Sequence, residues 1–488
     1  MDHPIQSLEP RELWEIFHQI TQIPRPSYHE ERIQEFVMGF GRSLGLETQK
    51  DQAGNIIIRK PATAGMENRK GVILQGHLDM VPQKNNNKAH NFVNDPIETR
   101  VEGEWVMANG TTLGADNGIG VSAALAVLAS RTVVHGPLEA LFTATEETGM
   151  DGAKGLKPGI LKGSILLNMD SEDEGELYVG CAGGEDVNVR FVYTAEEVPA
   201  GNRAFSLEVT GLKGGHSGMD IILQRGNANK VFFRLLNQAY RKAGARLARI
   251  EGGSLRNAIP REAVGIVTVD PAQASMLKLT LEEEFRLISD ELSAREPDMK
   301  MILAETELPA KAMDELTQVK LTASIMACPN GVIRMSDSMP GLVETSSNMA
   351  VVKSDVHAGT VDLSFLMRSS VDSARADLGH RLQALFGLAG ADISLTGGYP
   401  GWKPNMESPV LKTMVQVYEK NYGKTPEIKA IHAGLECGIL AGAYPGWDMI
   451  SFGPTIRFPH SPDEKVHVPS VKKFWDYLLE TLKSIPVR

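Results

Sequence analysis

The sequence predicts an α/β domain that is interrupted by a large inserted α+β domain. Up to about residue 184, apolar runs of strand length alternate with helical segments, which is typical of a mostly parallel sheet covered on both faces. From there to about residue 398, strand-like segments alternate apolar and polar residues, as strands with one exposed face do. A helix and a buried strand resume after GGYPGWKP. We therefore expect a first domain formed by 1–186 and 404–488, and an inserted domain formed by 187–403.

Length and composition fit a folded protein of two domains. The 488 residues exceed what one hydrophobic core normally organises, and 42% hydrophobic with 23% charged residues is ordinary. The formal charge of -11, with no local cluster of Lys or Arg, argues against a nucleic-acid or anionic-membrane partner. The N-terminal residues lack a secretory pattern, and Cys181, Cys328 and Cys437 suggest neither a disulfide framework nor a CxxC zinc site. These features predict a cytoplasmic protein.

The elements of the first domain follow from periodicity and turn residues. Residues 11–22 and 29–46 have helical apolar spacing and are separated by the breaker IPRPS. The segment ETQKDQAGNIIIRK predicts a hairpin that turns at Gly54 and Asn55. GVILQGH, LEALFTAT and SILLNMD predict buried strands, and GIGVSAALAVLAS predicts a helix between the first two.

The inserted domain has a different pattern. Residues 204–212 and 261–270 alternate like half-exposed strands, with the helical segment GNANKVFFRLLNQAYRKA between them. MLKLTLEEEFRLISDELSA, MKMILAETEL, LVETSSNMAVV and TVDLSFLMRSS continue the mixture of helices and strands. Beyond the insertion, SPVLKTMVQVYEKNYG predicts a helix and WDMISFGP predicts another buried strand.

Side chains of metal-binding type follow four of the apolar strands, and one more lies in a loop. They are His77 and Asp79 after GVILQG, Glu146 and Glu147 after LEALFTAT, Asp170 at the end of SILLNMD, His460 after MISFGPTIRFP, and Asp116 in TTLGADNGIG. Because ligands collect at the carboxyl ends of the strands in open α/β sheets, we expect these side chains to lie close together. One such residue at a strand end is more often a cap, but this coincidence favours a metal site.

The residue types indicate which metal ions would bind. Imidazole and carboxylate ligands suit zinc, manganese or cobalt. Their number exceeds the need of one tetrahedral ion, whereas two divalent ions about 3.5–4 Å apart, sharing a bridging carboxylate, account for it. His467 in PHSPDEKVHVP competes with His460, and spacing does not choose between them.

The adjacent glutamates Glu146 and Glu147 raise a separate question, because like charges repel and unpaired burial is costly. A solvated loop is one interpretation. The other is that the strand frays through the pair, so that successive side chains point to opposite sides and serve two cations.

These motifs resemble the M20 metallopeptidases. GHLDMVP is similar to the family's GHxDxVP element, ATEETG to its paired glutamates and PHSPDEKVHVP to its terminal His-x-x-x-Glu element. The order of the motifs and the insertion between them correspond along nearly the whole chain. GADNGIG, NMDSEDEGEL, GGHSGMDI and HAGLECG resemble most closely the branch of aminoacyl-histidine dipeptidases.

The resemblance implies a zinc-peptidase-like catalytic domain with two divalent metal ions per subunit, Zn²⁺ first and Co²⁺ or Mn²⁺ as alternatives. It implies that His77 and Asp170 bind one ion, that Glu147 and His460 bind the other, and that Asp116 bridges them. It thereby selects His460 from the two histidines.

The resemblance also implies how the remaining groups of the centre act. A cis peptide would join Asp116 to Asn117. Asp79 would accept the second ring N–H of His77 and fix its tautomer. Glu146 would be the general base, taking a proton from the metal-bridging water and delivering it to the leaving amine.

The resemblance assigns the inserted domain the roles of lid and dimerisation surface. His216 in GGHSG would reach the active site of the partner subunit and polarise the substrate carbonyl, so that a homodimer is required. Asn257 and Arg368 would hold the substrate's carboxylate, and Glu436 is a candidate for its α-amine. The plainer alternatives are a glycine-rich turn for His216, a structural salt bridge for Arg368 and a helix N-terminal residue for Glu436.

The expected activity is hydrolysis of dipeptides, especially Xaa-His dipeptides such as β-alanyl-histidine. An N-acyl amino acid deacylase or amidase of the same family is the first alternative, and the long insertion disfavours it. A catalytically silent binding homologue is the second, and the joint presence of the five ligand residues and Glu146 disfavours it.

Overall fold

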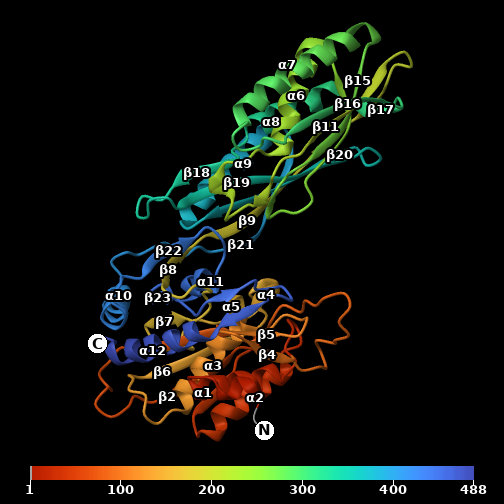
Figure 1. Cartoon of the computed structure of the whole chain (residues 1–488). Coiled ribbons are helices and arrows are strands. Elements are labelled where there is room, and N and C mark those ends of the chain that lie inside the picture. The colour runs from red at the N-terminus through yellow and green to blue at the C-terminus, as the bar shows by residue number, and fades with distance from the viewer. Residues whose placement is uncertain (1–2) are drawn as a thin grey trace. The chain divides into compact units, whose positions relative to one another are not determined.

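A computed structural model describes residues 3–488, and the chain divides into two compact units (Figure 1). The first comprises Met1–Cys181, Trp402–Ala430 and Leu435–Arg488, and the second comprises Ala182–Gly401 and Ile431–Gly434. The short return of the chain to the second unit at Ile431–Gly434 is a feature that the sequence did not indicate.

The first unit is built on an eight-stranded mixed sheet, which confirms the predicted α/β fold class. The four central strands β6, β3, β7 and β23 run parallel to one another. On either side of them, β1 pairs antiparallel with β2, β2 with β6, and β8 with β23. In spatial order the strands are β1 (Glu47–Lys50), β2 (Ile56–Lys60), β6 (Leu138–Thr143), β3 (Val72–His77), β7 (Ile165–Asn168), β23 (Asp448–Ser451), β8 (Glu176–Cys181) and β22 (Glu427–Ile431).

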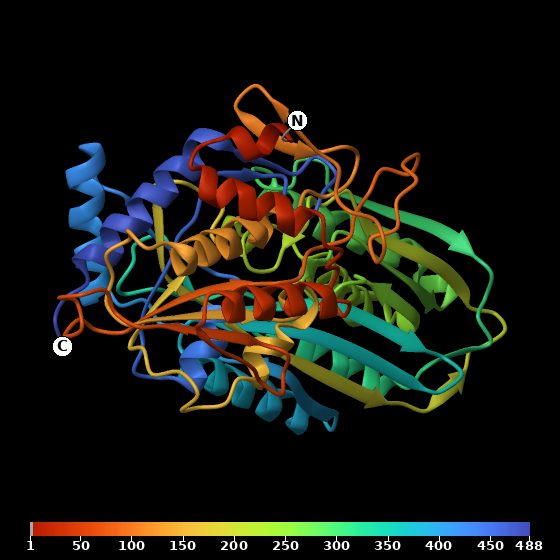
Figure 2. The same cartoon turned by 90° about the horizontal axis from the view of Figure 1, so that it is seen from below.

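The central strands are buried throughout, which explains their near-continuous apolar sequences. Every residue of β3, β6 and β7 is buried. Helix α3 packs on β3, and α1 packs on α3 (Figure 2). The helices of this unit are α1 (Arg11–Thr21), α2 (Glu31–Ser43), α3 (Ala115–Ala129), α4 (Glu146–Gly149), α5 (Asp151–Gly155), α10 (Pro409–Tyr422), α11 (Glu436–Ala443) and α12 (Val468–Ser484).

Local sequence signals explain where several of these elements begin and end. The predicted hairpin forms, with Lys50 on β1 opposite Ile56 on β2. The Ser408 side chain accepts the backbone N–H of Leu411 at the start of α10, and Gly423 ends that helix with a φ of 66°.

A second, four-stranded sheet carries the chain past β23 toward His460. Its spatial order is β24 (Ile456–Arg457), β25 (Lys465–His467), β5 (Trp105–Ala108) and β4 (Thr99–Glu102). The loop between β24 and β25 contains His460, whose φ is 59°. Because β24 and β25 pair with each other, this loop is held at both ends.

The second unit is built on an antiparallel sheet with helices on one face. The strands, in spatial order, are β16 (Lys300–Thr306), β11 (Arg203–Thr210), β15 (Ala263–Val269), β13 (Arg246–Gly252), β19 (Val343–Asp355), β20 (Thr360–Ser369), β9 (Gly183–Val192) and β21 (Asp392–Tyr399), with β18 (Gly331–Met335) paired to β19. Two short strand pairs accompany it, β10 (Ala195–Glu197) with β17 (Lys311–Met313) and β12 (Gly215–His216) with β14 (Ala258–Ile259).

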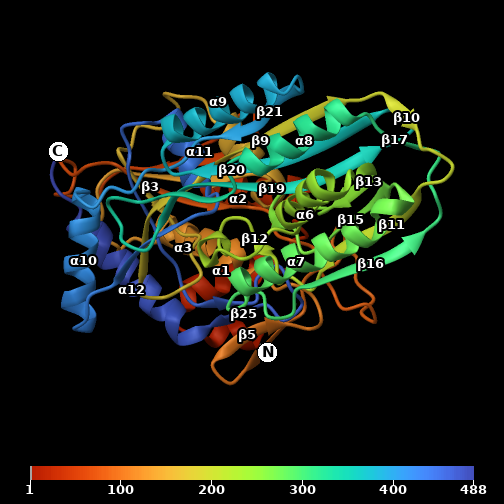
Figure 3. The same cartoon turned by 90° about the horizontal axis from the view of Figure 1, so that it is seen from above.

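The core of the second unit lies between this sheet and its helices. Figure 3 shows α6 (Ala228–Ala243), α7 (Ala274–Leu292) and α8 (Glu315–Ala327) side by side, and α9 (Asp372–Leu388) packs on β20 and β21. Phe232 and Phe365 are among the residues that fill the core. Residues of β9 alternate between buried and exposed, as expected for a sheet with one open face.

Among residues 3–488, no helix combines the length and the apolar character that crossing a membrane requires.

Candidate metal centre

The predicted metal-ligating side chains come together at the carboxyl ends of the central parallel strands of the first unit. Three groups of them have ligand atoms within 4.8 Å of one another. The segments that supply them are the last residue of β3 (His77), the first turn of α3 (Asp116), the start of α4 after β6 (Glu146 and Glu147), the loop after β7 (Asp170) and the loop after β24 (His460).

Asp116 occupies the middle of this arrangement. Its Oδ1 lies 3.0 Å from Nε2 of His77, and its Oδ2 lies 3.2 Å from Nε2 of His460. Nε2 of His77 is also 3.4 Å from Oδ1 of Asp170, and Nε2 of His460 is 3.0 Å from Oε2 of Glu147. The two carboxylate oxygens of Asp116 therefore face two different groups of ligands.

The donor atoms of the centre fit divalent cations. Within the described part of the chain, Oε1 of Glu147 and Oδ1 of Asp170 are buried without a hydrogen-bond partner. Burying an unpaired carboxylate is costly, and a cation bound by the nearby imidazoles and carboxylates removes that cost. The residues present therefore suit a pair of divalent metal ions.

The electrostatics of the centre favour positive charge. Contacts with the carboxylates of Asp116 and Glu147 raise the pKa of His460 to about 11. Burial by itself lowers the pKa of His77, but the carboxylates of Asp170, Asp116 and Asp79 outweigh burial and raise that pKa well above its usual value. The negative charge around both imidazole rings would therefore favour bound metal cations as well as bound protons.

The peptide bond between Asp116 and Asn117 is cis, as the resemblance implied. The structure also separates the two histidines of the C-terminal motif. His460 faces Asp116, whereas Nε2 of His467 lies 3.6 Å from a carboxylate oxygen of Glu104.

Asp79 ties together the segments that carry the other side chains. Its Oδ1 lies 3.3 Å from Nδ1 of His77, and its carboxylate accepts the backbone N–H groups of Glu146 at 2.9 Å and Glu147 at 3.2 Å. The Ser27 hydroxyl donates to it at 2.7 Å. Burial by itself raises the pKa of Asp79, but His77 and these donors lower it to about 2, so the carboxylate stays ionised.

The expectation that β6 frays through the glutamate pair is wrong. The strand ends at Thr143, Thr145 adopts a left-handed conformation with a φ of 55°, and Glu146 begins the single-turn helix α4. Successive helical residues differ in direction by roughly 100°, which still separates the two side chains. A left-handed residue placed between strand and helix gives no apolar pattern, so periodicity could not reveal it.

Both glutamates offer a carboxylate oxygen within 4.8 Å of a ring nitrogen of His77, but only Glu147 belongs to the group that contains His460. Oε2 of Glu147 faces His460. Burial raises the pKa of Glu146 well above its usual value, against the charge of His77 and with the help of Asp170 and Glu436.

Glu436 lies near the centre, at the start of α11, with 1% of its surface exposed. Its Oε2 accepts hydrogen bonds from Gln75 at 2.6 Å and from Thr143 at 2.7 Å. Oε1 has no partner among the described residues, and burial raises the pKa of Glu436 to about 7. This carboxyl can therefore still accept a hydrogen bond from a ligand.

The second unit brings three further predicted site residues, His216, Asn257 and Arg368, into one region. His216 on β12 pairs with Ala258 on β14, directly after Asn257. Nδ1 of His216 accepts the backbone N–H groups of Gly218 at 3.2 Å and Met219 at 3.0 Å, so the neutral ring carries its proton on Nε2.

Arg368 completes this region. It is buried, and its Nη1 donates to the Tyr399 hydroxyl at 3.2 Å. Burial and the charge of Arg368 together lower the pKa of His216. His432, the first residue of the HAGLECG motif, had been assigned no role; it contacts Ser346 at 2.7 Å, and burial lowers its pKa to about 3.

Two buried charged residues beside the metal-ligand segments were also missed. Arg25 lies in the IPRPS segment, which was interpreted only as a helix breaker, and Glu464 belongs to the PHSPDE motif, in which only the histidine was assigned a role. An arginine flanked by prolines between two helices was the available signal for the first.

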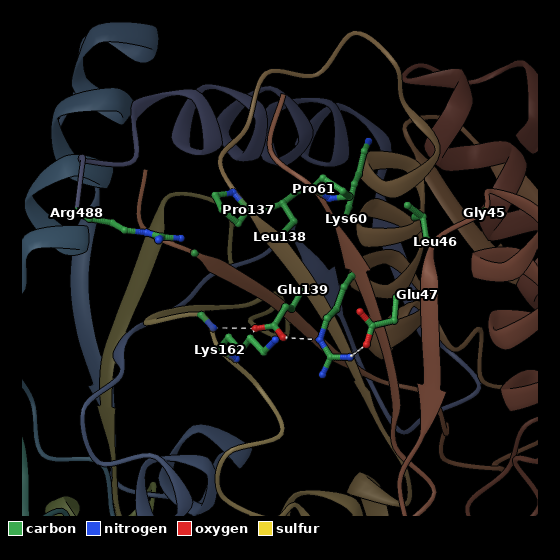
Figure 4. Close-up of a pocket in the computed structure, with 13 residues that line it drawn as sticks. Gly45, Leu46, Glu47, Lys60, Pro61, Pro137, Leu138, Glu139, Lys162 and Arg488 are labelled. Atoms are coloured by element: carbon green, nitrogen blue, oxygen red, sulfur yellow. Dashed lines mark hydrogen bonds and ion pairs between the residues drawn. The ribbon is translucent and has the colours of Figure 1, made fainter. Parts of the chain in front are cut away.

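A pocket of about 370 Å³ lies at the opposite edge of the same sheet, where β3 and β6 begin (Figure 4). Its central carboxylate, Glu139, accepts hydrogen bonds from Arg59 at 3.0 Å and from the backbone N–H groups of Lys162 and Gly163, both at 2.7 Å. None of the predicted site residues lines it. The predicted metal-ligating residues therefore lie at the other edge of the sheet, away from this pocket.

Comparison with known proteins identifies relatives over the whole chain. The model of Peptidase family M20/M25/M40 matches residues 73–484. The cytosol non-specific dipeptidase of Escherichia coli (strain K12) is 48% identical over 484 residues, covering 99% of both proteins.

Solved structures show the same relationship. The crystal structure of aminoacylhistidine dipeptidase from Vibrio alginolyticus has a TM-score of 0.95 and 48% identity, covering 99% of this chain and 98% of that one. Aminopeptidase PepT from Bacillus cereus has a TM-score of 0.57 at 16% identity, covering 98% of this chain and 99% of that one, which shows a shared fold.

Proposed function

The chain belongs to peptidase family M20/M25/M40, and we propose that it is a metal-dependent dipeptidase that hydrolyses Xaa-His and other dipeptides. The observation that carries the proposal is the central position of Asp116, whose two oxygens face two separate groups of ligands. The names of the two relatives at 48% identity support the substrate class, and β-alanyl-histidine belongs to it.

Two divalent ions would be held by the residues described above. His77, Asp170 and one oxygen of Asp116 would bind the first, and Glu147, His460 and the other oxygen would bind the second. The ligand set favours Zn²⁺ and also suits Co²⁺ or Mn²⁺. When bound, such ions supply Lewis-acid chemistry and lower the pKa of bound water.

Glu146 is the group best placed to move the proton. Its carboxyl is not in the group of ligand atoms that contains His460, and burial raises its pKa, which makes it a stronger proton acceptor. Glu146 would take a proton from the attacking water and deliver it to the leaving amine. Asp79 would keep the His77 ring in its ligand tautomer.

The groups that recognise the two ends of a dipeptide are also available. The Nε2–H of His216 would donate to the carbonyl oxygen as negative charge develops there. Asn257 and the buried guanidinium of Arg368 would hold the free carboxylate, and the free Oε1 of Glu436 would accept from the α-amine.

We also propose that the second unit serves as lid and as the dimerisation surface of a homodimer, so that His216 acts in the partner subunit's site. We further propose a cytoplasmic location, which the name of the Escherichia coli relative supports. The acidic balance is consistent with a small peptide substrate rather than a nucleic acid or a membrane.

Substrate profiling tests the activity directly. We expect the purified protein loaded with Zn²⁺, Co²⁺ or Mn²⁺ to hydrolyse a panel of free dipeptides, Xaa-His dipeptides included, and to lose that activity when a chelator removes the metal. Product formation would be followed by chromatography. Turnover of N-acetyl amino acids without turnover of free dipeptides would instead support the deacylase alternative.

Subunit mixing tests the role of His216. We expect His216→Ala to lose about 10²–10³-fold in kcat, because the developing oxyanion loses a hydrogen-bond donor. After subunit exchange with the inactive Glu146→Ala variant, half of the dimers are hybrids with one complete site of two, so about a quarter of the wild-type activity should return. No recovery after verified exchange would place His216 in its own subunit's site.

A further inference from the structure

The Glu464 carboxylate binds four consecutive backbone N–H groups of the segment that ends in Asp116. Oε2 accepts from Leu113 at 2.7 Å and Gly114 at 2.9 Å, and Oε1 accepts from Ala115 at 2.8 Å and Asp116 at 3.2 Å. With 2% of its surface exposed, Glu464 receives little competition from water. Every one of these contacts is a donor, as an ionised carboxylate requires.

The Arg25 guanidinium binds backbone carbonyl groups of the adjoining segments. Nη1 donates to the carbonyls of Leu78 at 2.8 Å and Asp79 at 2.6 Å, and Nη2 donates to that of Gly114 at 2.5 Å. Arg25 therefore ties the residues that follow His77 to the residues that precede Asp116.

The glycines of the LGADNG motif make room for this guanidinium. A Cβ at Gly114 would lie 2.5 Å from Nη2 of Arg25, and a Cβ at Gly118 would lie 2.9 Å from the same atom. Gly114 also has a φ of 71°, which other residues rarely adopt. Its N–H is bound by Glu464 and its carbonyl by Arg25, so both peptide groups beside it are held.

We propose that Glu464 and Arg25 are positioning residues that hold the carboxylate of Asp116 in the orientation in which it bridges two metal ions. The inference rests on the proposed function and adds two residues to which no role has been assigned. They act on the backbone, and they do not touch the substrate.

Geometry explains why the backbone contacts matter. The Asp116 side chain has only two rotatable bonds, so a fixed backbone leaves its two oxygens little freedom. A carboxylate shared by two ions must be placed within about half an ångström. Glu464 lies four residues after His460, and its own N–H donates to Ser461 at 3.0 Å, so the same short turn carries a ligand of the second ion.

The test compares metal affinity in Glu464→Gln and wild-type protein. Glutamine keeps the volume but turns an NH₂ group toward N–H donors, so part of the 113–116 segment loses its acceptor. We expect the affinity for the more weakly bound Co²⁺ ion, measured by calorimetric titration of the metal-free protein, to fall about 10–100-fold. The visible absorption of the Co²⁺-loaded protein should change, and kcat should fall with little change in KM.

Glu139→Gln is the matched control. Glu139 is also a buried carboxylate that accepts two backbone N–H groups, but it lies at the opposite edge of the same sheet (Figure 4). We expect this variant to lose thermal stability while its Co²⁺ affinity and absorption remain those of the wild type. An equal loss of Co²⁺ affinity in both variants would mean a general effect of stability and would overturn the proposal.

Arg25→Lys is the second variant, used also if Glu464→Gln does not fold by circular dichroism. An ammonium group cannot reproduce the planar fork that binds three carbonyls, so the same change in Co²⁺ titration and absorption is expected. Wild-type Co²⁺ affinity in folded Glu464→Gln or in folded Arg25→Lys would overturn the positioning role alone. A wild-type protein that fails to bind two ions would overturn the proposed function itself, and the positioning role with it.

Discussion

Glu146→Ala is expected to lower kcat by about 10²–10⁴-fold while the purified protein still binds two metal ions. The reason is that Glu146 would transfer the proton but not bind an ion, whereas Glu147 faces His460 and Asp116. Steady-state kinetics and metal analysis of the same preparation measure the two properties together.

The neighbouring glutamate provides the comparison for this variant. Glu147→Ala should lose both activity and affinity for one ion, because its Oε2 belongs to the group that contains His460. Loss of an ion in Glu146→Ala, with retention of both in Glu147→Ala, would show that the roles within the pair are reversed.

Asp116→Ala is expected to lose affinity for both ions and therefore all measurable turnover. Its two carboxylate oxygens are 3.0 Å from Nε2 of His77 and 3.2 Å from Nε2 of His460. Removing this side chain therefore takes one ligand from each of the two proposed metal sites. Asp170→Ala should weaken one ion only, because Asp170 contacts the His77 group. Calorimetric titration of the metal-free proteins separates the two results.

A control for charge removal is available in the same motif as Asp170. Asp173 forms an ion pair with Arg457 at 2.7 Å and is 39% exposed. Asp173→Ala should therefore bind both ions normally. If Asp116→Ala affected one ion and Asp170→Ala the other, Asp116 would be an ordinary ligand and the bridging assignment would be wrong.

The candidate centre also explains why the adjacent glutamates are tolerated. The burial and like charge that make Glu146 and Glu147 costly are the conditions that favour binding of divalent cations. The left-handed Thr145 and the N–H groups bound by Asp79 fix the backbone of the pair, and only Glu147 reaches the group that contains His460. Alternation along a strand, which the sequence suggested, is not the cause.

Much of the first unit could be predicted because its central strands β3, β6 and β7 are buried on both faces. Continuous apolar runs such as VILQGH in β3 end on polar residues, and the carboxyl ends of parallel strands meet at one edge. His77, Asp116, the pair Glu146 and Glu147, and Asp170 could thus be grouped from sequence position and residue chemistry, whereas the choice of His460 over His467 came from the family resemblance. The antiparallel hairpin of β1 and β2 was predicted from its turn, but the antiparallel pairing of β2 with β6 and of β8 with β23 was not, because apolar patterning does not record strand direction.

By itself, the sequence indicated which residues are candidates for metal binding, since residue type and position at a strand end are local properties. Only the tertiary structure decided how they are held. The two oxygens of Asp116 face different histidines, and the Nε2–H tautomer of His216 follows from two backbone donors. Arg25 and Glu464 bind backbone groups from 53 to 351 positions away in the chain. Such contacts use carbonyl and N–H groups that every residue possesses, so they leave no pattern in the sequence.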